Sequence, residues 1–217
     1  MKSDNHRIDG IAAAIPLANL DTDQIMPKQF LRGIDKSGLD RGVLYDMRFD
    51  ETGQPRPDFI LNQHAFRRTQ ILLGGPNFGC GSSREHAVWG LLQFGIKAII
   101  ASSFGEIFYS NAMNNGLLLV ALDVPQVTAL MADVAAPETA RLTIDLQAMV
   151  VRSHQHEFSF GLSPRHREMF LQGQDLIGAS MTHLPAIDRF AQEHWQRHPW
   201  MKDVARQTRS RLDTVQS

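Results

Sequence analysis

Residues 71–101 have the sequence ILLGGPNFGCGSSREHAVWGLLQFGIKAIIA, and this stretch decides the fold. The apolar run at 71–73 predicts a strand, residues 83–94 predict a helix, and the apolar run at 97–101 predicts a second strand. Short apolar strands that alternate with helices are typical of a parallel sheet with right-handed crossovers. Because ligands bind beyond the carboxyl ends of such strands, we expect the turn at 79–84 to face a ligand.

Further strands, helices and turns are predicted on both sides of this stretch. Residues 142–146 and 157–160 alternate apolar and polar side chains, which is typical of half-buried antiparallel strands. Residues 19–28 favour turns, and Pro27 fits the first position of a helix. Residues 32–58 hold many glycines, prolines and charges, and they predict a long irregular excursion. The other predicted elements are strands at 8–16 and 117–121, a helix capped by Ser102 or Ser103 that runs to about Asn115, and helices at 126–135, 163–170 and 187–195.

The bulk composition is that of an ordinary globular protein. The chain has 217 residues, a formal net charge of −1 and 43% hydrophobic residues, so it has no bulk charge to attract nucleic acid or an anionic membrane. The sequence holds no apolar run near the roughly 20 residues that span a bilayer, and no signal peptide opens it. We therefore expect a cytoplasmic protein.

Cys80 is the only cysteine in the sequence, and we interpret it as a small packing residue. One thiol forms no internal disulfide, and it does not supply the several thiolates that an iron–sulfur cluster or a cysteine-rich zinc site requires. His154 and His156 alternate on a predicted hairpin, where we expect exposed polar side chains rather than ligands. Redox or Lewis-acid chemistry therefore has to come from another chain.

Residues 79–86, GCGSSREH, combine two glycines with hydroxyl, guanidinium, carboxylate and imidazole groups. The spacing matches neither a Walker A loop, nor a dinucleotide-binding fingerprint, nor the serine elbow of hydrolases. Two interpretations remain: Ser82 or Ser83 caps an ordinary helix, or the backbone N–H groups of the turn bind an anion. Arg84 favours the anion site, because a cation in the first turn of a helix opposes the helix dipole.

Two motifs together resemble a known family. Residues 21–25 (DTDQI) and 77–87 (NFGCGSSREHA), with supporting stretches at 27–31, 57–59 and 104–115, are similar to the small subunits of 3-isopropylmalate dehydratases, which are relatives of the aconitase swivel domain. The resemblance implies an α/β fold, a swivelling β/β/α domain with a central, mostly parallel sheet, helices and a second layer of antiparallel strands. We expect a single swivel domain at 1–198 and a polar C-terminal tail at 199–217.

The resemblance also implies a function. Members of the family are halves of a heteromeric hydro-lyase of leucine biosynthesis, which interconverts 2-isopropylmalate and 3-isopropylmalate through isopropylmaleate. Their large-subunit partner carries a [4Fe–4S] cluster, and no metal ligand is expected on the small chain itself. One alternative is a related hydratase for citraconate or dimethylmaleate. Another, from a different class, is a non-catalytic anion-binding or regulatory module that kept the fold.

Residue roles follow from the same resemblance. Ser82 matches the family's catalytic base, acting as an alkoxide, and Arg84 matches the arginine that binds a substrate carboxylate. A guanidinium suits that role because it binds a planar carboxylate through two hydrogen bonds. The further substrate-binding residues that the resemblance implies are Ser83, Thr22, Asp23 and Arg32. We also hypothesise that Met26 and residues 30–32 form an apolar wall for the isopropyl group; the alternative is that Phe30 and Leu31 belong to the core.

Overall fold

The sheet that organises the fold has seven strands: β1 (Arg7–Ile15), β2 (Thr69–Gly74), β3 (Ala98–Ala101), β4 (Leu118–Ala121), β5 (Arg141–Asp145), β6 (Val150–Arg152) and β7 (Glu157–Ser159). The helices are α1 (Thr22–Ile25), α2 (Tyr45–Arg48), α3 (Glu85–Phe94), α4 (Glu106–Asn114), α5 (Val124–Asp133), α6 (Pro164–Gln172) and α8 (Leu184–Arg197). Short 3-10 turns are η1 (Lys28–Phe30), η2 (Leu39–Gly42), η3 (Ile60–Asn62), η4 (His64–Phe66) and η5 (Pro199–Met201). The structure, a computed structural model, describes residues 6–31, 37–81, 84–173, 178, 181, 183–206 and 208–209.

The strand order is β4-β3-β2-β1-β5-β6-β7, and β1 joins two halves of different character. On one side β1 runs parallel to β2, which starts a parallel set with β3 and β4. On the other side Arg7–Ile11 pair antiparallel with β5, which is followed by β6 and β7. The register shifts between Ile11 and Ala12, where β1 passes from one partner to the other. The predicted α/β fold with parallel and antiparallel strands is confirmed, and the antiparallel strands continue the same sheet.

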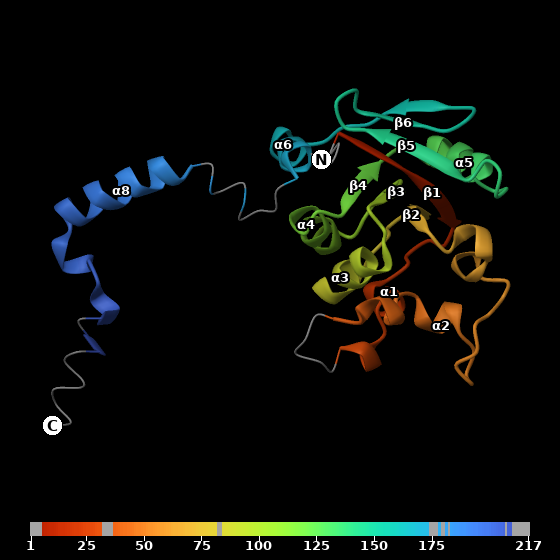
Figure 1. Ribbon diagram of the computed structural model, residues 1–217, viewed down its shortest axis with the longest axis horizontal. Helices are drawn as coiled ribbons and strands as arrows, with labels where there is room; N and C mark the ends of the chain where they lie inside the picture. Colours follow the sequence, from red (N-terminus) through yellow and green to blue (C-terminus); the bar gives the residue numbers. More distant parts are fainter. Residues whose placement is uncertain are drawn as a thin grey trace. The chain divides into compact units, whose positions relative to one another are not determined.

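The parallel half carries the core of the protein. Nearly every residue of β2, β3 and β4 is buried. Helices α3 and α4 lie on one side of these strands and α5 lies on the other (Figure 1). Cover on both faces explains why these strands are continuous apolar runs and do not alternate. The strands predicted at 71–73, 97–101 and 117–121 are confirmed, with bounds that differ by at most two residues.

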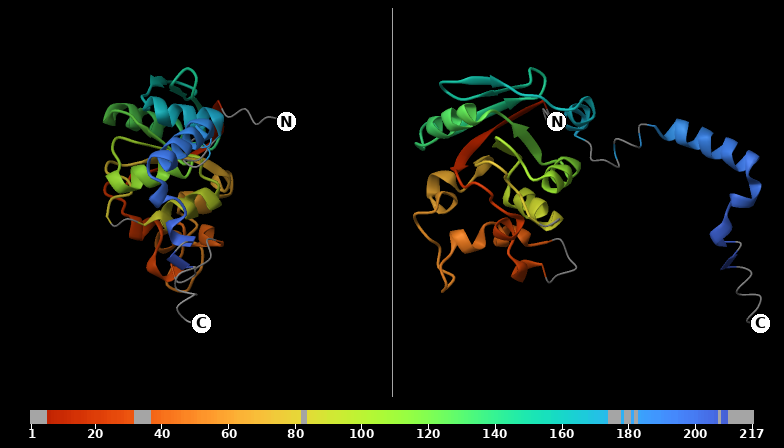
Figure 2. Two further views of the ribbon diagram at one scale, coloured as in Figure 1. Left: turned by 90° about the vertical axis from the view of Figure 1, so that its left-hand side faces the viewer. Right: turned by 180° about the vertical axis from the view of Figure 1, so that it is seen from behind.

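The sheet curls, so that its two edges approach each other. One cavity of ≈ 360 Å³ is lined by the last residue of edge strand β4 with the two that follow it (Ala121–Asp123) and by the last residue of edge strand β7 with the two that follow it (Ser159–Gly161). Strands β5 and β7 confirm the predictions at 142–146 and 157–160. Strand β6 was not predicted, because three residues are too few for alternation to be recognised. The antiparallel strands and the turns of residues 37–66 lie at opposite ends of the part of the chain that contains the sheet (Figure 2).

The start of α4 differs from the prediction. The helix begins at Glu106 after Gly105, so neither Ser102 nor Ser103 caps it. The Ser103 hydroxyl instead accepts a hydrogen bond from the backbone N–H of Asn77 at 2.8 Å. A tertiary contact has therefore taken the hydroxyl that the local pattern assigned to a helix cap.

The start of α1 also differs, because a capping box acts earlier than the predicted proline. The Asp21 side chain accepts from the backbone N–H of Gln24 at 2.7 Å, and the Gln24 side chain accepts from the backbone N–H of Asp21 at 3.0 Å. The helix therefore begins at Thr22. Pro27, predicted to open a helix, precedes only the short turn η1.

The β6–β7 turn is fastened to the end of α5. His154 and His156 are exposed, as predicted, but His156 also has a structural partner: its Nδ1 lies 2.8 Å from Oδ2 of Asp133. The Asp133 side chain is only 3% exposed, and it also accepts a hydrogen bond from the Ser153 hydroxyl. Contacts between residues 20 or more positions apart in the sequence thus hold the β6–β7 turn against the end of α5.

The excursion predicted at 32–58 has only short turns of regular structure in its described part, from residue 37 onward. Arg48 organises this segment. Its guanidinium donates to the carbonyl of Val43 at 3.1 Å and to Oδ1 of Asn62 at 3.3 Å, and it lies 4.7 Å from the ring centroid of Phe94. The Asn62 amide donates back to the carbonyl of Arg48. These contacts hold the excursion against the end of α3.

The chain divides after residue 175 into two compact units. The domain boundary predicted between 198 and 199 stays a prediction. In the second unit, α8 contains the helix predicted at 187–195 and extends it at both ends. None of its residues is buried, although Leu184, Ile187, Phe190 and Trp195 are large apolar side chains. Among the residues that the structure describes, no helix has the length and apolar character needed to cross a membrane.

Candidate active site

Three loops follow adjacent parallel strands and meet at one edge of the sheet: residues 16–21 after β1, 75–81 after β2, and 102–105 after β3. The middle loop is hydrogen-bonded to the third. Phe78 donates its backbone N–H to the carbonyl of Ser103 at 3.0 Å, and Gly105 donates to the carbonyl of Phe78 at 2.9 Å. The glycine-rich turn therefore leaves the sheet at the carboxyl ends of parallel strands, where ligands bind in such folds.

The middle loop is also hydrogen-bonded to the first loop. Gly79 donates to the carbonyl of Leu20 at 2.7 Å, and Thr22 donates to the carbonyl of Cys80 at 2.9 Å. The Cys80 thiol donates to the carbonyl of Asn19 at 3.3 Å, which agrees with its interpretation as a packing residue. The two sequence motifs of the family resemblance are thus side by side in the fold.

Two glycines permit this close packing. At Gly79, where φ is +73°, a Cβ atom would lie 2.3 Å from Cγ of the buried Phe108. At Gly105 a Cβ atom would lie 2.5 Å from the carbonyl oxygen of Gly79. Any side chain at either position would push the loops apart, since real Cβ contacts are not this short.

Arg84 and Asp23 form an ion pair between the two motifs, through Nη1 and Oδ1. The Arg84 side chain is 17% exposed and that of Asp23 is 42% exposed, so the pair lies at the surface of the loop cluster and a ligand can reach it. Arg84 occupies the N-cap position of α3 with no side-chain capping bond, and the helix starts at Glu85. The helix predicted from Ser83 thus begins two residues later, and the capping residue is not a serine.

The structure brings together three of the six predicted site residues. Thr22 and Asp23 are consecutive in α1, and Arg84 reaches Asp23 from the start of α3. Thr22 is only 1% exposed, so its side chain is packed in the junction between the loops. The remaining three predicted residues, Ser82, Ser83 and Arg32, lie outside the described residues.

A cluster of polar side chains beside the loops was not predicted from the sequence. Asn115 follows α4; its amide donates to Oε1 of Glu85 at 2.7 Å and its Oδ1 accepts from the indole N–H of Trp89 at 3.0 Å. Glu85 is therefore a link between α3 and α4. The His86 ring lies edge-on to that of Trp89, with ring centroids 4.9 Å apart. Partners about 30 positions apart leave no local pattern, so no sequence signal was available.

The residues proposed to form an apolar wall differ in how deeply they are buried. Met26 is fully buried and packs against α3, where a Cβ atom at Gly90 would lie 2.1 Å from its terminal methyl group. Phe30 and Leu31 are half-buried against the core, and Phe30 lies 5.0 Å from the ring of Tyr45. Met26 therefore belongs to the core, whereas Phe30 and Leu31, for which the alternative was a place in the core, pack against it and keep exposed surface.

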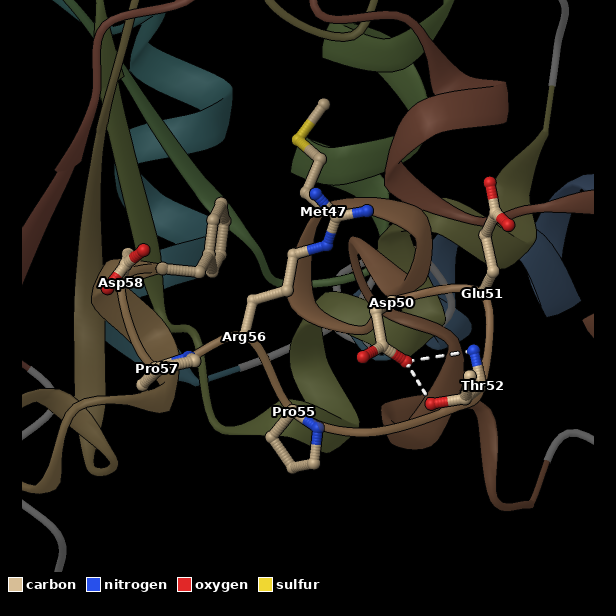
Figure 3. Close-up of a pocket in the computed structure, with 9 residues that line it drawn as sticks. Met47, Asp50, Glu51, Thr52, Pro55, Arg56, Pro57 and Asp58 are labelled. Carbon is tan, nitrogen blue, oxygen red and sulfur yellow. Dashed lines mark hydrogen bonds between the residues drawn. The ribbon is translucent and has the colours of Figure 1, made fainter.

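A wide groove of ≈ 740 Å³ lies in the excursion, away from these loops in the chain. It is lined by residues between Met47 and Phe59. Figure 3 shows the Asp50 carboxylate accepting from the hydroxyl and backbone N–H of Thr52, while Glu51 and Asp58 add two more carboxylates to the lining. Arg56 is the one cation among the lining residues, so the groove suits a dicarboxylate less well than the Arg84 loops do.

Comparisons with known proteins agree with this geometry. Residues 5–125 match the model of the aconitase C-terminal domain, and residues 128–164 match a second model described as LeuD_N. The chain is 61% identical to "3-isopropylmalate dehydratase small subunit 1" of Chromobacterium violaceum over 206 residues, which cover 95% of this chain and 97% of the relative. This chain belongs to the 3-isopropylmalate dehydratase small-subunit family.

Other members of the small-subunit family are similar over almost the whole chain. The "3-isopropylmalate dehydratase small subunit 2" of Salmonella typhimurium is 46% identical, covering 92% of this chain and 96% of that relative. A crystal structure of a 3-isopropylmalate dehydratase from Methanocaldococcus jannaschii is 26% identical, with a TM-score of 0.63, and covers 84% of this chain and 98% of that one. The family is one of hydro-lyase subunits in leucine biosynthesis, and a small subunit implies a large-subunit partner.

Proposed function

We propose that this chain supplies the proton-accepting and carboxylate-binding half of a 3-isopropylmalate dehydratase active site. The observation that carries the proposal is the ion pair between Arg84 and Asp23. It joins the two sequence motifs at the carboxyl ends of adjacent parallel strands, on surface that a ligand can reach. The printed names of the relatives support the same reaction.

The reaction that we propose needs two contributions from this chain. Interconversion of 2-isopropylmalate and 3-isopropylmalate through isopropylmaleate removes a proton from a carbon next to a carboxylate, and hydroxide leaves the neighbouring carbon. A base has to accept that proton, and a cation has to hold the carboxylate so that the base is aligned with it.

Arg84 is proposed as the cation. A guanidinium has five N–H donors in a planar fork, so the bond from Nη1 to Asp23 leaves enough donors for a substrate carboxylate to be held through two hydrogen bonds. Asp23 would then orient the guanidinium, and the half-buried setting of Arg84 strengthens its charge. The base is proposed to be Ser82, with Ser83 and Thr22 as further hydroxyl groups and Arg32 as a second carboxylate-binding residue.

The iron–sulfur cluster is proposed to lie on the large subunit. The sequence has one cysteine, and the described residues contain no group of three or more His, Cys, Asp or Glu side chains that would hold a metal ion. The donor set of this chain therefore does not fit a cluster, which takes several thiolates. When bound to the partner, the cluster would supply a Lewis-acidic iron for the departing hydroxyl group. We place the assembled enzyme in the cytoplasm.

The test uses the chain assembled with its large subunit and follows the double bond of isopropylmaleate by its absorbance. Ser82→Ala is expected to lower kcat about 10²- to 10⁴-fold, because it removes the base. Arg84→Lys is expected to lower kcat/KM about 10- to 100-fold, because an ammonium group does not bind a carboxylate bidentately. Arg141→Lys, in an exposed ion pair with Asp9, is the matched control and is expected to leave activity unchanged.

The same assay separates the alternatives. Faster turnover of citraconate or dimethylmaleate than of isopropylmaleate would assign the chain to a related hydratase. Full activity of Ser82→Ala would refute the base assignment. Absence of turnover by the assembled, unsubstituted chain would favour a non-catalytic anion-binding module.

A further inference from the structure

Two asparagines in neighbouring loops share an uncommon backbone conformation. Asn19, in the loop after β1, has φ +56°, and Asn77, in the loop after β2, has φ +57°. Left-handed backbone is costly for residues with a Cβ atom, and asparagine tolerates it better than most. The Asn77 amide donates to Oδ1 of Asn19 at 2.8 Å, although the two residues are 58 positions apart. A specific side-chain bond therefore joins two strained positions.

Backbone contacts fix both ends of this bond. Asn19 donates its backbone N–H to the carbonyl of Pro76 at 2.9 Å, and its own carbonyl accepts from the Cys80 thiol. Asn77 donates its backbone N–H to the hydroxyl of Ser103 at 2.8 Å. Asn77 is thus the residue at which the loops after β1, β2 and β3 are all connected.

The bond lies just ahead of both halves of the site. Asn19 comes four residues before Asp23, and Asn77 comes seven residues before Arg84. The short chain segments between them run through Leu20–Asp21 and Phe78–Gly81, which are hydrogen-bonded to each other. A shift at the asparagine pair would therefore move the loop that carries Asp23 relative to the loop that carries Arg84.

We propose that the Asn19–Asn77 amide pair positions these two loops for the dehydration, without touching the substrate. The proposal rests on the proposed function of Arg84 and Ser82. Misplacing a reacting group by about 1 Å costs on the order of 100-fold in rate, so a bond that sets loop position acts on the chemical step. Asn19 and Asn77 are positioning residues in this scheme.

Glycine substitutions test the pair, because glycine removes the side chain with its amide and adopts left-handed backbone without strain. In the enzyme assembled with its large subunit, Asn19→Gly and Asn77→Gly are each expected to lower kcat about 10- to 100-fold. The KM for isopropylmaleate is expected to stay within about threefold, since the Arg84 guanidinium that binds the substrate carboxylate is retained while the alignment of the base is lost. The double variant is expected to lose no more than either single variant, because both remove the same bond.

Asn77→Asp is the matched rescue variant. Aspartate has the size of asparagine and also tolerates left-handed backbone, and the amide of Asn19 can turn over to donate to the new carboxylate. Its kcat is expected to return to within about threefold of the original. Equal melting temperatures and equal affinity for the large subunit across all variants are expected, since the glycine changes leave the loop backbone bonds intact.

Three results would overturn the proposal: an unchanged kcat in both glycine variants, additive losses in the double variant, or losses that follow the melting temperature. Ser82→Ala and Arg84→Lys are assayed alongside to separate the two proposals. If these two variants lose activity and the asparagine variants do not, only the asparagine proposal is wrong. If these two variants retain activity, the proposed function is wrong and this inference with it.

Discussion

Left-handed backbone is concentrated where the two site loops meet. Asn19, Asn77, Gly79 and Gly81 all have positive φ, and they lie within the same pair of loops. Glycine adopts this backbone freely, but at the two asparagines it is tolerated only where the surroundings determine it, and here these are the carbonyls and N–H groups of the neighbouring loop. The least favourable of these backbone conformations, those of Asn19 and Asn77, are therefore held in place by contacts between the loops.

Gly79→Ala tests how much the close packing at a left-handed position of these loops contributes to stability. The new methyl group would meet the ring of Phe108 and the residue would keep a left-handed backbone, so the free energy of unfolding is expected to fall by about 2–5 kcal/mol. Gly116→Ala is the matched control, because Gly116 also has a positive φ (+82°) but has no atom within 4 Å of the new Cβ position. It is expected to lose only about 1–2 kcal/mol. Urea unfolding measures both, and equal losses would contradict the packing explanation.

At the scale of the elements, the contact between α5 and the β6–β7 turn depends on one buried carboxylate. Burial by itself raises the pKa of Asp133, but hydrogen bonds from Ser153 and His156, with the nearby charges of His156 and His154, outweigh it. The pKa of Asp133 in the folded chain therefore lies below its ordinary value. The carboxylate accepts from two side chains on the turn, so its charged form is the one that holds the hairpin.

The sign of the pH dependence follows from this lowered pKa. The unfolded chain takes up a proton at Asp133 near the ordinary value of about 3.9, whereas the folded chain takes it up only at lower pH. The stabilisation is therefore complete above about pH 5 and is lost as the pH falls through the folded pKa. Asp133→Asn is expected to lower stability at pH 6 and to flatten the loss between pH 6 and pH 3 in urea unfolding. Asp188→Asn, an exposed aspartate on α8, is the control; an equally flattened profile there would contradict the assignment.

The elements that the sequence predicted are those whose signal is local. The buried strands at 71–73, 97–101 and 117–121 are continuous apolar runs, and Ser163 caps α6 by accepting from the backbone N–H of His166. What was not predicted depends on partners far away in the chain. Ser103 bonds Asn77 in place of capping α4. The start of α1 is an exception, because the Asp21–Gln24 capping box that precedes Pro27 is a local signal.

The same division holds for the candidate site. Arg84, Thr22 and Asp23 could be predicted as candidate site residues because their motifs are contiguous in the sequence. Asn115 and the pair Asn19–Asn77 were not found, because their roles come from bonds that join separate loops. A single asparagine in a turn is too common to carry such information, and only the folded chain shows which asparagines face each other.

At the scale of the whole molecule, the two units differ in how much they bury. The first holds the sheet and the core, whereas the described residues from 176 onward include no buried one. The apolar side chains of α8 and η5, among them Phe190 and Trp200, are exposed. Hydrophobic burial supplies most of folding stability, so the described part of the second unit has little folding stability of its own.

Two truncated variants test where the domain ends. A chain that stops after Gly173 and a chain that stops after His198 are both expected to keep the melting temperature of the full chain within about 2 °C, since neither deletion removes a described buried residue. Differential scanning calorimetry measures both. If the shorter chain melts more than about 5 °C lower while the longer one does not, the swivel domain extends to residue 198 as the sequence predicts.

The position of β1 between β2 and β5 has a consequence for the order of folding. Ile11 pairs with Thr69 on one side and with Arg141 on the other, so the first strand to be synthesised has partners that come about 58 and 130 residues later. A ribosome that adds about 5–20 residues per second would leave β1 without β5 for many seconds. The loops that carry Asp23 and Arg84 can meet once β2 and β3 are made, so we expect the candidate site to assemble before the sheet is complete.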